Sequence, residues 1–429
     1  MPPVGVYAAL SGIAAVATFL AMFPARRLAW RFGFVVAPDE RRIHAQPTPE
    51  IGGLPMFVAF LVAMGIASFL PPLHDLFRGS SEPLGVVVGG MVAFGVGFLD
   101  DARDMSAPAK MAGQVLAATA LYFFGVTMLQ FKVPFGGFIV LSNSLLPLIT
   151  AVWVVAITNA VNLIDGLDGL AAGVVAIAAG TLAVYGLRLV DLGVLPADNL
   201  GPLIAAIACG VALGFLPHNL HPARAFMGDA GALFLGLLMA VATMLIGGRA
   251  PDVSGETYFF FAPLFIPLFI LGVPLTDMAF AYIRRTARGT GFHHADLDHL
   301  HHRLLRLGHG PRRTVAILWA WTAVLSGFVL YPLFGKRGNA VIPFGVLVLV
   351  LALFTLLHPS RNGASDDEEG DQDPTSGRPA GGARGILPPP FWRDQPPDGK
   401  MTPVHSAAVP ADRAHEPHDG GGRARSRTE

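Results

Sequence analysis

The sequence predicts an all-α polytopic membrane protein, a bundle of about 11 transmembrane helices with the N-terminus outside and the C-terminus in the cytoplasm. Of its 429 residues, 53% are hydrophobic and only 14% are charged. Soluble domains carry about 25% charged residues, so most of this surface is expected to face lipid. The formal net charge is zero, which gives no indication of a nucleic-acid partner.

Apolar runs long enough, or nearly long enough, to cross a bilayer as helices recur along the chain. In order, they are residues 5–22, 53–70, 84–99, 112–129, 144–162, 170–187, 200–217, 230–247, 258–276, 314–333 and 340–357. Residues 131–141 are too short and too rich in Gly and Pro to span, and they are expected to form a surface hairpin. Cys209 is the only cysteine, and it is expected to be a small core residue.

The basic residues set the orientation of the bundle. The loops on the side of Arg26 contain 15 Lys and Arg residues, whereas the opposite loops contain six. The positive-inside rule places the richer loops in the cytoplasm. Residues 1–358 are expected to form the transmembrane domain. Residues 359–429 are rich in Pro, Gly and charge without a hydrophobic period, so they are expected to form a disordered cytoplasmic tail.

No Asp, Glu, Lys or Arg lies within the apolar runs. Charged side chains are therefore expected only outside the membrane interior. Ion-coupled transporters commonly place ionisable groups inside the membrane. A membrane transporter, the alternative of another class, is therefore disfavoured. Acidic, amide and histidine side chains gather instead in four of the loops assigned to the cytoplasm, which indicates a site on that side.

The first of these four clusters begins where the run 84–99 meets water. Asp100 and Asp101 can bind a divalent cation, or one of them can act as a base toward an acidic hydroxyl. The alternative is a helix end with solvated acids. Lys110 follows, and it either approaches a phosphate or extends to the membrane interface.

The second cluster joins two spans through a very short loop that contains Asn159, Asn162, Asp165 and Asp168. Two glycines in this loop allow a tight turn and a close approach of backbone to a ligand. On a continuing helical turn, Asn162 and Asp165 would share a face. A polar turn without function is the alternative, but such a turn does not require paired amides and acids.

The third cluster precedes the run 230–247 and contains Asn219, Arg224, Phe226 and Asp229. Asp229 stands at the start of a span, where a carboxylate can simply cap the helix. Its neighbours favour a binding site, because an aromatic ring can stack on a base while Arg holds a phosphate.

The fourth cluster has six His in residues 293–309. If the segment is helical, Asp298, His299 and His302 share a face, and with Arg303 they could bind a pyrophosphate and stabilise leaving-group charge. Transition-metal ligation is the alternative. The four clusters together fit Mg²⁺-assisted chemistry on a nucleotide pyrophosphate, since Mg²⁺ prefers oxygen ligands and the anion requires neutralisation.

Five motifs occur in order along residues 1–357: DERRIH…PTPEIGG (39–53), GFLDD…K…Q (97–114), NAVNLIDGLDGLAAG (159–173), AFMGDAGALFLG (225–236) and HADLDHLHHRL (294–304). This series resembles the polyprenyl-phosphate N-acetylhexosamine-1-phosphate transferases. The resemblance implies transfer of N-acetylglucosamine-1-phosphate from UDP-N-acetylglucosamine to polyprenyl phosphate, which releases UMP and initiates cell-envelope glycan assembly. The implied partners are a UDP-sugar and a polyprenyl phosphate in the inner leaflet. A homodimer is a further possible assembly.

The resemblance also implies roles for single residues. The implied catalytic residues are Asp100, Asp101, Asp229 and His299. Asp229 would be the principal Mg²⁺ ligand and Asn162 a second, with Mn²⁺ as the alternative ion. Asp100 would position or deprotonate the lipid phosphate, with support from Asp101. The residues implied in substrate binding are Lys110, Asn159, Asp165, Asp168, Asn219, Phe226, His301, His302 and Arg303.

Within the same superfamily, the phospho-N-acetylmuramoyl-pentapeptide transferases of peptidoglycan synthesis are the alternative. That group has three consecutive His in the last loop. Here His299 is separated by Leu300 from His301 and His302, which is closer to the N-acetylglucosamine-type enzymes. The expected location is the inner (plasma) membrane, with the active site in the cytoplasm.

Overall fold

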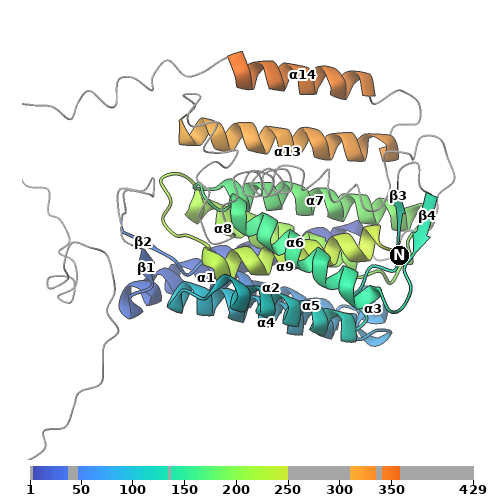
Figure 1. Ribbon diagram of the computed structural model, residues 1–429, viewed down its shortest axis with the longest axis horizontal. Coiled ribbons are helices and arrows are strands. Elements are labelled where there is room, and N and C mark those ends of the chain that lie inside the picture. Colours follow the sequence, from blue (N-terminus) through green and yellow to red (C-terminus); the bar gives the residue numbers. More distant parts are fainter. Residues whose placement is uncertain (1–2, 37–46, 134–136, 250–309, 335–340, 358–429) are drawn as a thin grey trace, which may run out of the picture. The chain divides into compact units, whose positions relative to one another are not determined.

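The computed structural model describes residues 3–36, 47–133, 137–249, 310–334 and 341–357 (Figure 1). Its helices are α1 (Val4–Phe32), α2 (Gly53–Phe69), the 3-10 turn η1 (Pro71–Leu73), α3 (His74–Arg78), α4 (Glu82–Arg103), α5 (Ala107–Phe123), α6 (Leu146–Ile164), α7 (Leu170–Asp191), α8 (Gly201–Asn219), α9 (Gly228–Gly247), α13 (Pro311–Phe334) and α14 (Val341–Leu357). The predicted disordered tail lies outside the described residues.

The helices confirm the membrane-protein prediction in its coarser form. Ten of the predicted runs coincide with described helices, and the run 258–276 lies outside the described residues. Seven described helices are long and apolar enough to cross a membrane, or eight if α2 and the turn that follows it count as one bent span. The chain is thus a mostly helical, multi-pass membrane protein. A total of eleven spans and the orientation of the termini stay predictions.

The bent span shows how proline interrupts a helix. The segments Gly53–Phe69 and Pro71–Arg78 meet at an angle of 94°. Leu70 between them is extended, with ψ at 122°. Proline disfavours the helical conformation of the residue before it, and Pro71 follows Leu70, so the helix must end there.

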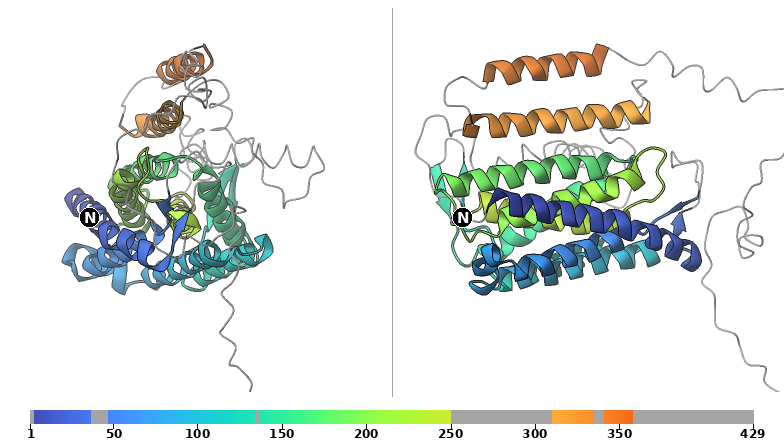
Figure 2. Two further views of the ribbon diagram at one scale, coloured as in Figure 1. Left: turned by 90° about the vertical axis from the view of Figure 1, so that its left-hand side faces the viewer. Right: turned by 180° about the vertical axis from the view of Figure 1, so that it is seen from behind.

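Helix α9 is the centre of the bundle. The apolar window of α9 is entirely buried, and α9 packs against α2, α4, α6, α7 and α8. Figure 2 shows it enclosed by its neighbours. In contrast, α1 packs on α8 and α2 and leaves apolar side chains such as Val16 and Leu20 exposed. On a membrane helix such side chains face lipid.

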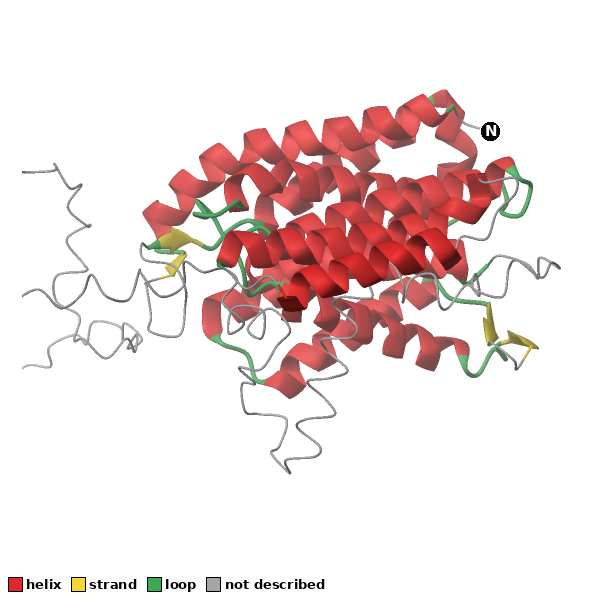
Figure 3. Ribbon diagram, turned by 90° about the horizontal axis from the view of Figure 1, so that it is seen from above, coloured by secondary structure: helices red, strands yellow, loops and turns green. Residues whose placement is uncertain are grey.

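Two small hairpins lie at opposite ends of the bundle (Figure 3). Strands β3 (Gln130–Val133) and β4 (Gly137–Val140) pair antiparallel, which confirms the hairpin predicted for residues 131–141. At the other end, β1 (Val35–Val36) pairs antiparallel with β2 (Thr48–Pro49).

The end with β1 and β2 also carries the α8–α9 loop. The backbone N–H of Phe226 in that loop donates to the carbonyl of Pro49 at 2.8 Å, and the N–H of Gly52 donates back to the Phe226 carbonyl at 2.9 Å. These bonds place the loop between α1 and α2 beside the start of α9, so motifs far apart in sequence meet at one end of the bundle.

One boundary differs from the prediction. The apolar run ends at residue 99, but α4 continues to Arg103. Asp100 and Asp101 therefore lie on the last helical turns rather than in a loop. Hydropathy indicates where the apolar environment ends, whereas the helix continues as long as its backbone hydrogen bonds do, here to Asp104 with a positive φ of 47°.

Candidate active site

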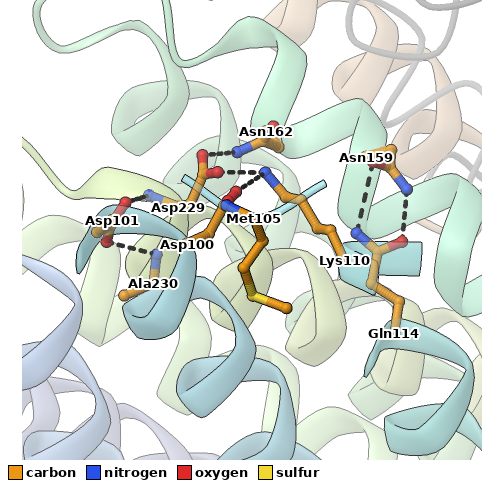
Figure 4. A network of polar contacts seen from close by, with 9 residues as sticks. All are labelled: Asp100, Asp101, Met105, Lys110, Gln114, Asn159, Asn162, Asp229 and Ala230. Atoms are coloured by element: carbon orange, nitrogen blue, oxygen red, sulfur yellow. Dashed lines mark hydrogen bonds and ion pairs between the residues drawn. The ribbon is translucent and has the colours of Figure 1, made fainter. Parts of the chain in front are cut away.

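A polar cluster lies where the ends of four helices meet (Figure 4). Asp100 and Asp101 come from the last turns of α4, Lys110 from the first turn of α5, Asn162 from the last turn of α6 and Asp229 from the first turn of α9. The structure therefore brings together five of the predicted site residues from three separate motifs.

Lys110 links two carboxylates of the cluster. Its ammonium lies 2.8 Å from Oδ2 of Asp100 and also contacts Oδ2 of Asp229. Asn162 donates from Nδ2 to Oδ1 of Asp229 at 2.6 Å, and the backbone N–H of Met105 donates to Oδ1 of Asp100 at 2.7 Å. Each carboxylate is thus held by two donors, and a positive charge stands between them.

Asp101 has a different surrounding from Asp100. Its Oδ1 accepts the backbone N–H of Asp229 at 2.7 Å, and its Oδ2 accepts that of Ala230 at 3.0 Å. Both N–H groups belong to the first turn of α9, where a helix has no internal acceptors for its donors. No side chain at the N-cap of α9 fills this role. Asp101 therefore caps α9 from a neighbouring helix, and the reading of Asp229 as the cap of its own helix is wrong.

Two glycines permit this close approach of α4 and α9. Gly228 has φ at +66°, and a Cβ there would lie 2.5 Å from Oδ2 of Asp101. At Gly97, a Cβ would lie 2.4 Å from the Asp229 carbonyl oxygen. A side chain at either position would push the two helices apart and separate the Asp101 carboxylate from the N–H groups that it caps.

A pair of amides joins α5 and α6 on the same side as the cluster. Asn159 donates from Nδ2 to Oε1 of Gln114 at 2.7 Å, and Gln114 donates back at 3.4 Å. Asn159 and Gln114 lie about one helical turn from Asn162 and Lys110, respectively. Asn159, expected to bind substrate, is thus engaged within the chain, where it holds Lys110 beside Asn162. Gln114 is the last residue of the motif at 97–114, but no role was predicted for it from the sequence.

A second group of carboxylates lies close to this cluster. Burial, and then the negative charges of Glu50, Asp229, Asp101 and Asp168, raise the pKa of Asp165 well above its ordinary value. Such crowding of acids is relieved by a bound cation. Glu50 was missed by sequence reasoning. It stands in the PTPEIGG motif, but its approach to the site depends on the bridge between Glu50 and Phe226, which sequence pattern does not reveal.

The loops around Asp165 and Phe226 are tied by buried polar contacts. Asn219 accepts the N–H of Gly169 at 2.9 Å and donates to the Ala225 carbonyl at 3.0 Å. Its side chain is 2% exposed, so the geometry gives it a positioning role, and the predicted contact with substrate stays a prediction.

Asp168 also bridges these loops. Its Oδ2 lies 2.8 Å from Nδ1 of His221 and accepts the N–H of Ala223 at 3.0 Å. Arg312 of α13 donates to the His221 carbonyl at 3.3 Å. His221 was missed, although its position in the HNLHPAR segment beside Phe226 was a usable signal. The aromatic ring of Phe226 is half-buried, and its predicted contact with a base stays a prediction.

The last predicted cluster lies outside the described residues. It contains His299, His301, His302 and Arg303, and its roles stay predictions.

The donors of the described cluster fit a hard divalent cation. In the part of the chain that the structure describes, no group of three or more His, Cys, Asp or Glu could hold a metal ion unaided. However, the Lys110 ammonium already occupies a cation position between Asp100 and Asp229. Mg²⁺ is commonly held by one or two carboxylates, with water and substrate phosphates as its other ligands. The site thus suits an ion that is bound jointly with a phosphate substrate.

Comparison with known proteins agrees with this geometry. The sequence model of glycosyl transferase family 4 matches residues 83–247, which include the whole cluster. The decaprenyl-phosphate N-acetylglucosaminephosphotransferase of Mycobacterium tuberculosis is 38% identical over 363 residues, which cover 83% of this chain and 90% of that protein. The chain belongs to glycosyl transferase family 4. The resemblance inferred from the five motifs is confirmed.

Two further relatives are similar to this chain over most of their own length. The probable undecaprenyl-phosphate N-acetylglucosaminyl 1-phosphate transferase of Bacillus subtilis is 34% identical over 74% of this chain and 81% of its own length. The phospho-N-acetylmuramoyl-pentapeptide-transferase of Desulforudis audaxviator is 32% identical over 69% of this chain and 88% of its own length.

The cap on α9 gives a direct prediction for Asp101→Ala in this family-4 transferase. Two buried N–H groups lose their acceptor, so the free energy of unfolding should fall by about 2 kcal/mol. Asp101→Asn keeps one acceptor oxygen and should lose about half as much. Thermal unfolding in detergent is the measurement, and the melting temperature should decrease in the order wild type, Asp101→Asn, Asp101→Ala. Asp198→Ala, an exposed carboxylate, is the matched control, and equal melting of Asp101→Ala and this control would contradict the capping role.

Proposed function

We propose that this chain transfers N-acetylglucosamine-1-phosphate from UDP-N-acetylglucosamine to a polyprenyl phosphate, giving polyprenyl-diphospho-N-acetylglucosamine and UMP. The observation that carries the proposal is the cluster of Asp100, Lys110, Asn162 and Asp229 at one end of a membrane bundle. It offers carboxylates and a cation for a pyrophosphate, next to the bilayer that would hold a lipid acceptor. The names of the relatives with 34–38% identity support the same donor and acceptor.

The reaction joins two anions. A phosphate oxygen of the lipid attacks the β-phosphorus of the nucleotide sugar, and the bond between the β-phosphorus and the bridging oxygen breaks as UMP leaves. The site must reduce the repulsion between the reactants and align them. Lys110 is placed for this task, since its mostly buried ammonium can move from the two aspartates to a phosphate oxygen. Bound at Asp229 and Asn162, Mg²⁺, or Mn²⁺ in its place, would supply the additional positive charge.

The two adjacent aspartates then have separate tasks. Asp100 shares Lys110 with Asp229, so it can orient the ammonium toward the acceptor phosphate. The second ionisation of a phosphate monoester has a pKa of about 6, so the nucleophile is largely ionised at neutral pH. Placement of the acceptor therefore outweighs removal of a proton in the role of Asp100. Asp101 keeps Asp229 in position.

The remaining predicted residues are assigned to the donor. Asp165, Asp168 and Phe226 would bind the nucleotide, and the last-loop residues His299, His301, His302 and Arg303 would bind the pyrophosphate and sugar. The catalytic end would face the cytoplasm of the inner membrane, because the loops on this side contain 15 Lys and Arg against six on the other.

The proposed reaction is tested with purified protein in vesicles that contain polyprenyl phosphate. Labelled UDP-N-acetylglucosamine with Mg²⁺ should give one labelled lipid product and an equal amount of UMP, and chelation of Mg²⁺ should stop both. UDP-N-acetylmuramoyl-pentapeptide serves as the competing donor. Lipid product from the muramoyl donor alone would replace the proposed substrate, and labelled sugar inside the vesicles without UMP would indicate transport.

Replacement of the lysine tests the charge at the centre of the cluster. Lys110→Gln removes the cation between Asp100 and Asp229, so turnover should fall about 100- to 1000-fold. The measurement is UMP release at saturating donor. Arg78→Gln, which removes an exposed positive charge of α3, should retain wild-type turnover. A Lys110→Gln variant within about twofold of wild type would refute the role.

The pKa of Asp165 predicts how metal affinity depends on pH. Because this pKa is raised, the carboxyl keeps its proton above the usual range, and binding of a cation nearby must release that proton. The Mg²⁺ concentration for half-maximal activity should therefore rise as the pH falls. Glu50→Gln removes one charge that raises the pKa of Asp165, so the rise should move to lower pH. Activity titrations between about pH 5 and 9 measure both effects, and an unshifted profile in Glu50→Gln would contradict them.

A further inference from the structure

A second polar group lies at the same end of the bundle, between α1, α8 and the α8–α9 loop. Nε2 of His218 lies 3.1 Å from the carbonyl oxygen of Phe19. The His218 ring contacts the rings of Phe19 and Phe23 at centroid distances of 4.9 and 5.2 Å. The backbone N–H of Arg224 donates to the His218 carbonyl at 2.8 Å. Arg26 is three residues after Phe23, so it lies on the same face of α1.

Within the described residues, the two arginines of this group, Arg26 and Arg224, lack negative partners. Arg26 and Arg224 are close enough for their charges to repel each other, and both act on His218. Within the described part of the chain, no ion pair joins either guanidinium to a carboxylate. Among the described residues, Nε of Arg26 is buried and has no hydrogen-bond acceptor. A buried donor without an acceptor and two nearby like charges both cost free energy, and a bound anion would lower both costs.

The surroundings indicate where the anion comes from. Phe19, Leu20 and Phe23 are 37%, 57% and 45% exposed on α1, a helix long and apolar enough to cross a membrane. Trp30, further along the helix, is 42% exposed, and exposed Trp is typical of the membrane–water interface. Arg26 thus stands where an apolar surface meets the headgroup region. A phosphate held there is best supplied by a lipid.

We propose that Arg26 and Arg224 bind the phosphate of an anionic phospholipid. Arg forms paired hydrogen bonds with phosphate oxygens, and basic pockets between membrane helices are suited to lipid headgroups. One phosphate between the two arginines ties α1 to the α8–α9 loop. Arg224 is five residues before Asp229, so a bound lipid stabilises the segment that leads into the catalytic cluster. This site was not foreseen, because Arg224 was expected to hold the phosphate of the substrate.

The test measures lipid binding and does not depend on transferase activity. The purified full chain is reconstituted in phosphatidylcholine vesicles that contain a trace of spin-labelled lipid. The fraction of label that the protein immobilises is measured for phosphatidylglycerol and for phosphatidylcholine. Wild type should prefer phosphatidylglycerol. Arg26→Gln and Arg224→Gln should each lower that preference about fivefold. Arg26→Lys keeps the charge but loses the paired donors, so its preference should fall between those of wild type and Arg26→Gln.

Arg27→Gln is the matched control, since Arg27 is the exposed neighbour of Arg26 on α1 and carries the same charge. It should leave the preference nearly unchanged. An equal loss in Arg27→Gln would show a general surface-charge effect and overturn the site. Competition by inorganic phosphate at the concentration of the lipid would show a site for free anions and would also overturn the proposal. Thermal unfolding in phosphatidylcholine alone verifies that each variant is folded. If Arg26→Gln does not fold, the lipid preference of Arg224→Gln, a variant of an exposed loop position, tests the proposal instead.

Discussion

The capping of α9 by Asp101 is the interaction on which the rest of the site depends. A carboxylate in a membrane bundle is costly unless donors surround it, and here the free N–H groups at the start of α9 supply two of them. The same bonds fix the start of α9 against α4 and so fix Asp229, which then meets Lys110 and Asn162. Gly97 and Gly228 are small because this contact leaves no space for a side chain.

The two adjacent aspartates, Asp100 and Asp101, make different contacts in this arrangement. Asp101 has both oxygens engaged by backbone N–H groups, whereas Asp100 and Asp229 share the ammonium of Lys110. The shared ammonium balances the negative charge of these two carboxylates. Arg224 belongs to the α8–α9 loop that leads into this cluster, so one short loop connects the proposed catalytic centre with the proposed lipid site.

Much of this fold was predictable, since a helix that crosses lipid requires a long apolar run. The prediction also grouped Asp100, Lys110, Asn162 and Asp229. Successive spans cross the membrane in opposite directions, so every second loop lies on the same side. It could not assign the cap, which depends on how α4 crosses α9, nor the end of α4 beyond residue 99. Glu50 was missed for the same kind of reason: a backbone bridge to Phe226 leaves no mark in hydropathy or spacing.

The most direct test is an experimental structure of the protein with Mg²⁺ and UDP-N-acetylglucosamine. The account predicts that Asp101 remains bonded to the backbone of Asp229 and Ala230, that the ion binds at Asp229, and that the Lys110 ammonium turns to a phosphate oxygen. A structure in which Asp101 leaves the start of α9 and coordinates the ion, while Asp229 does not, would contradict it.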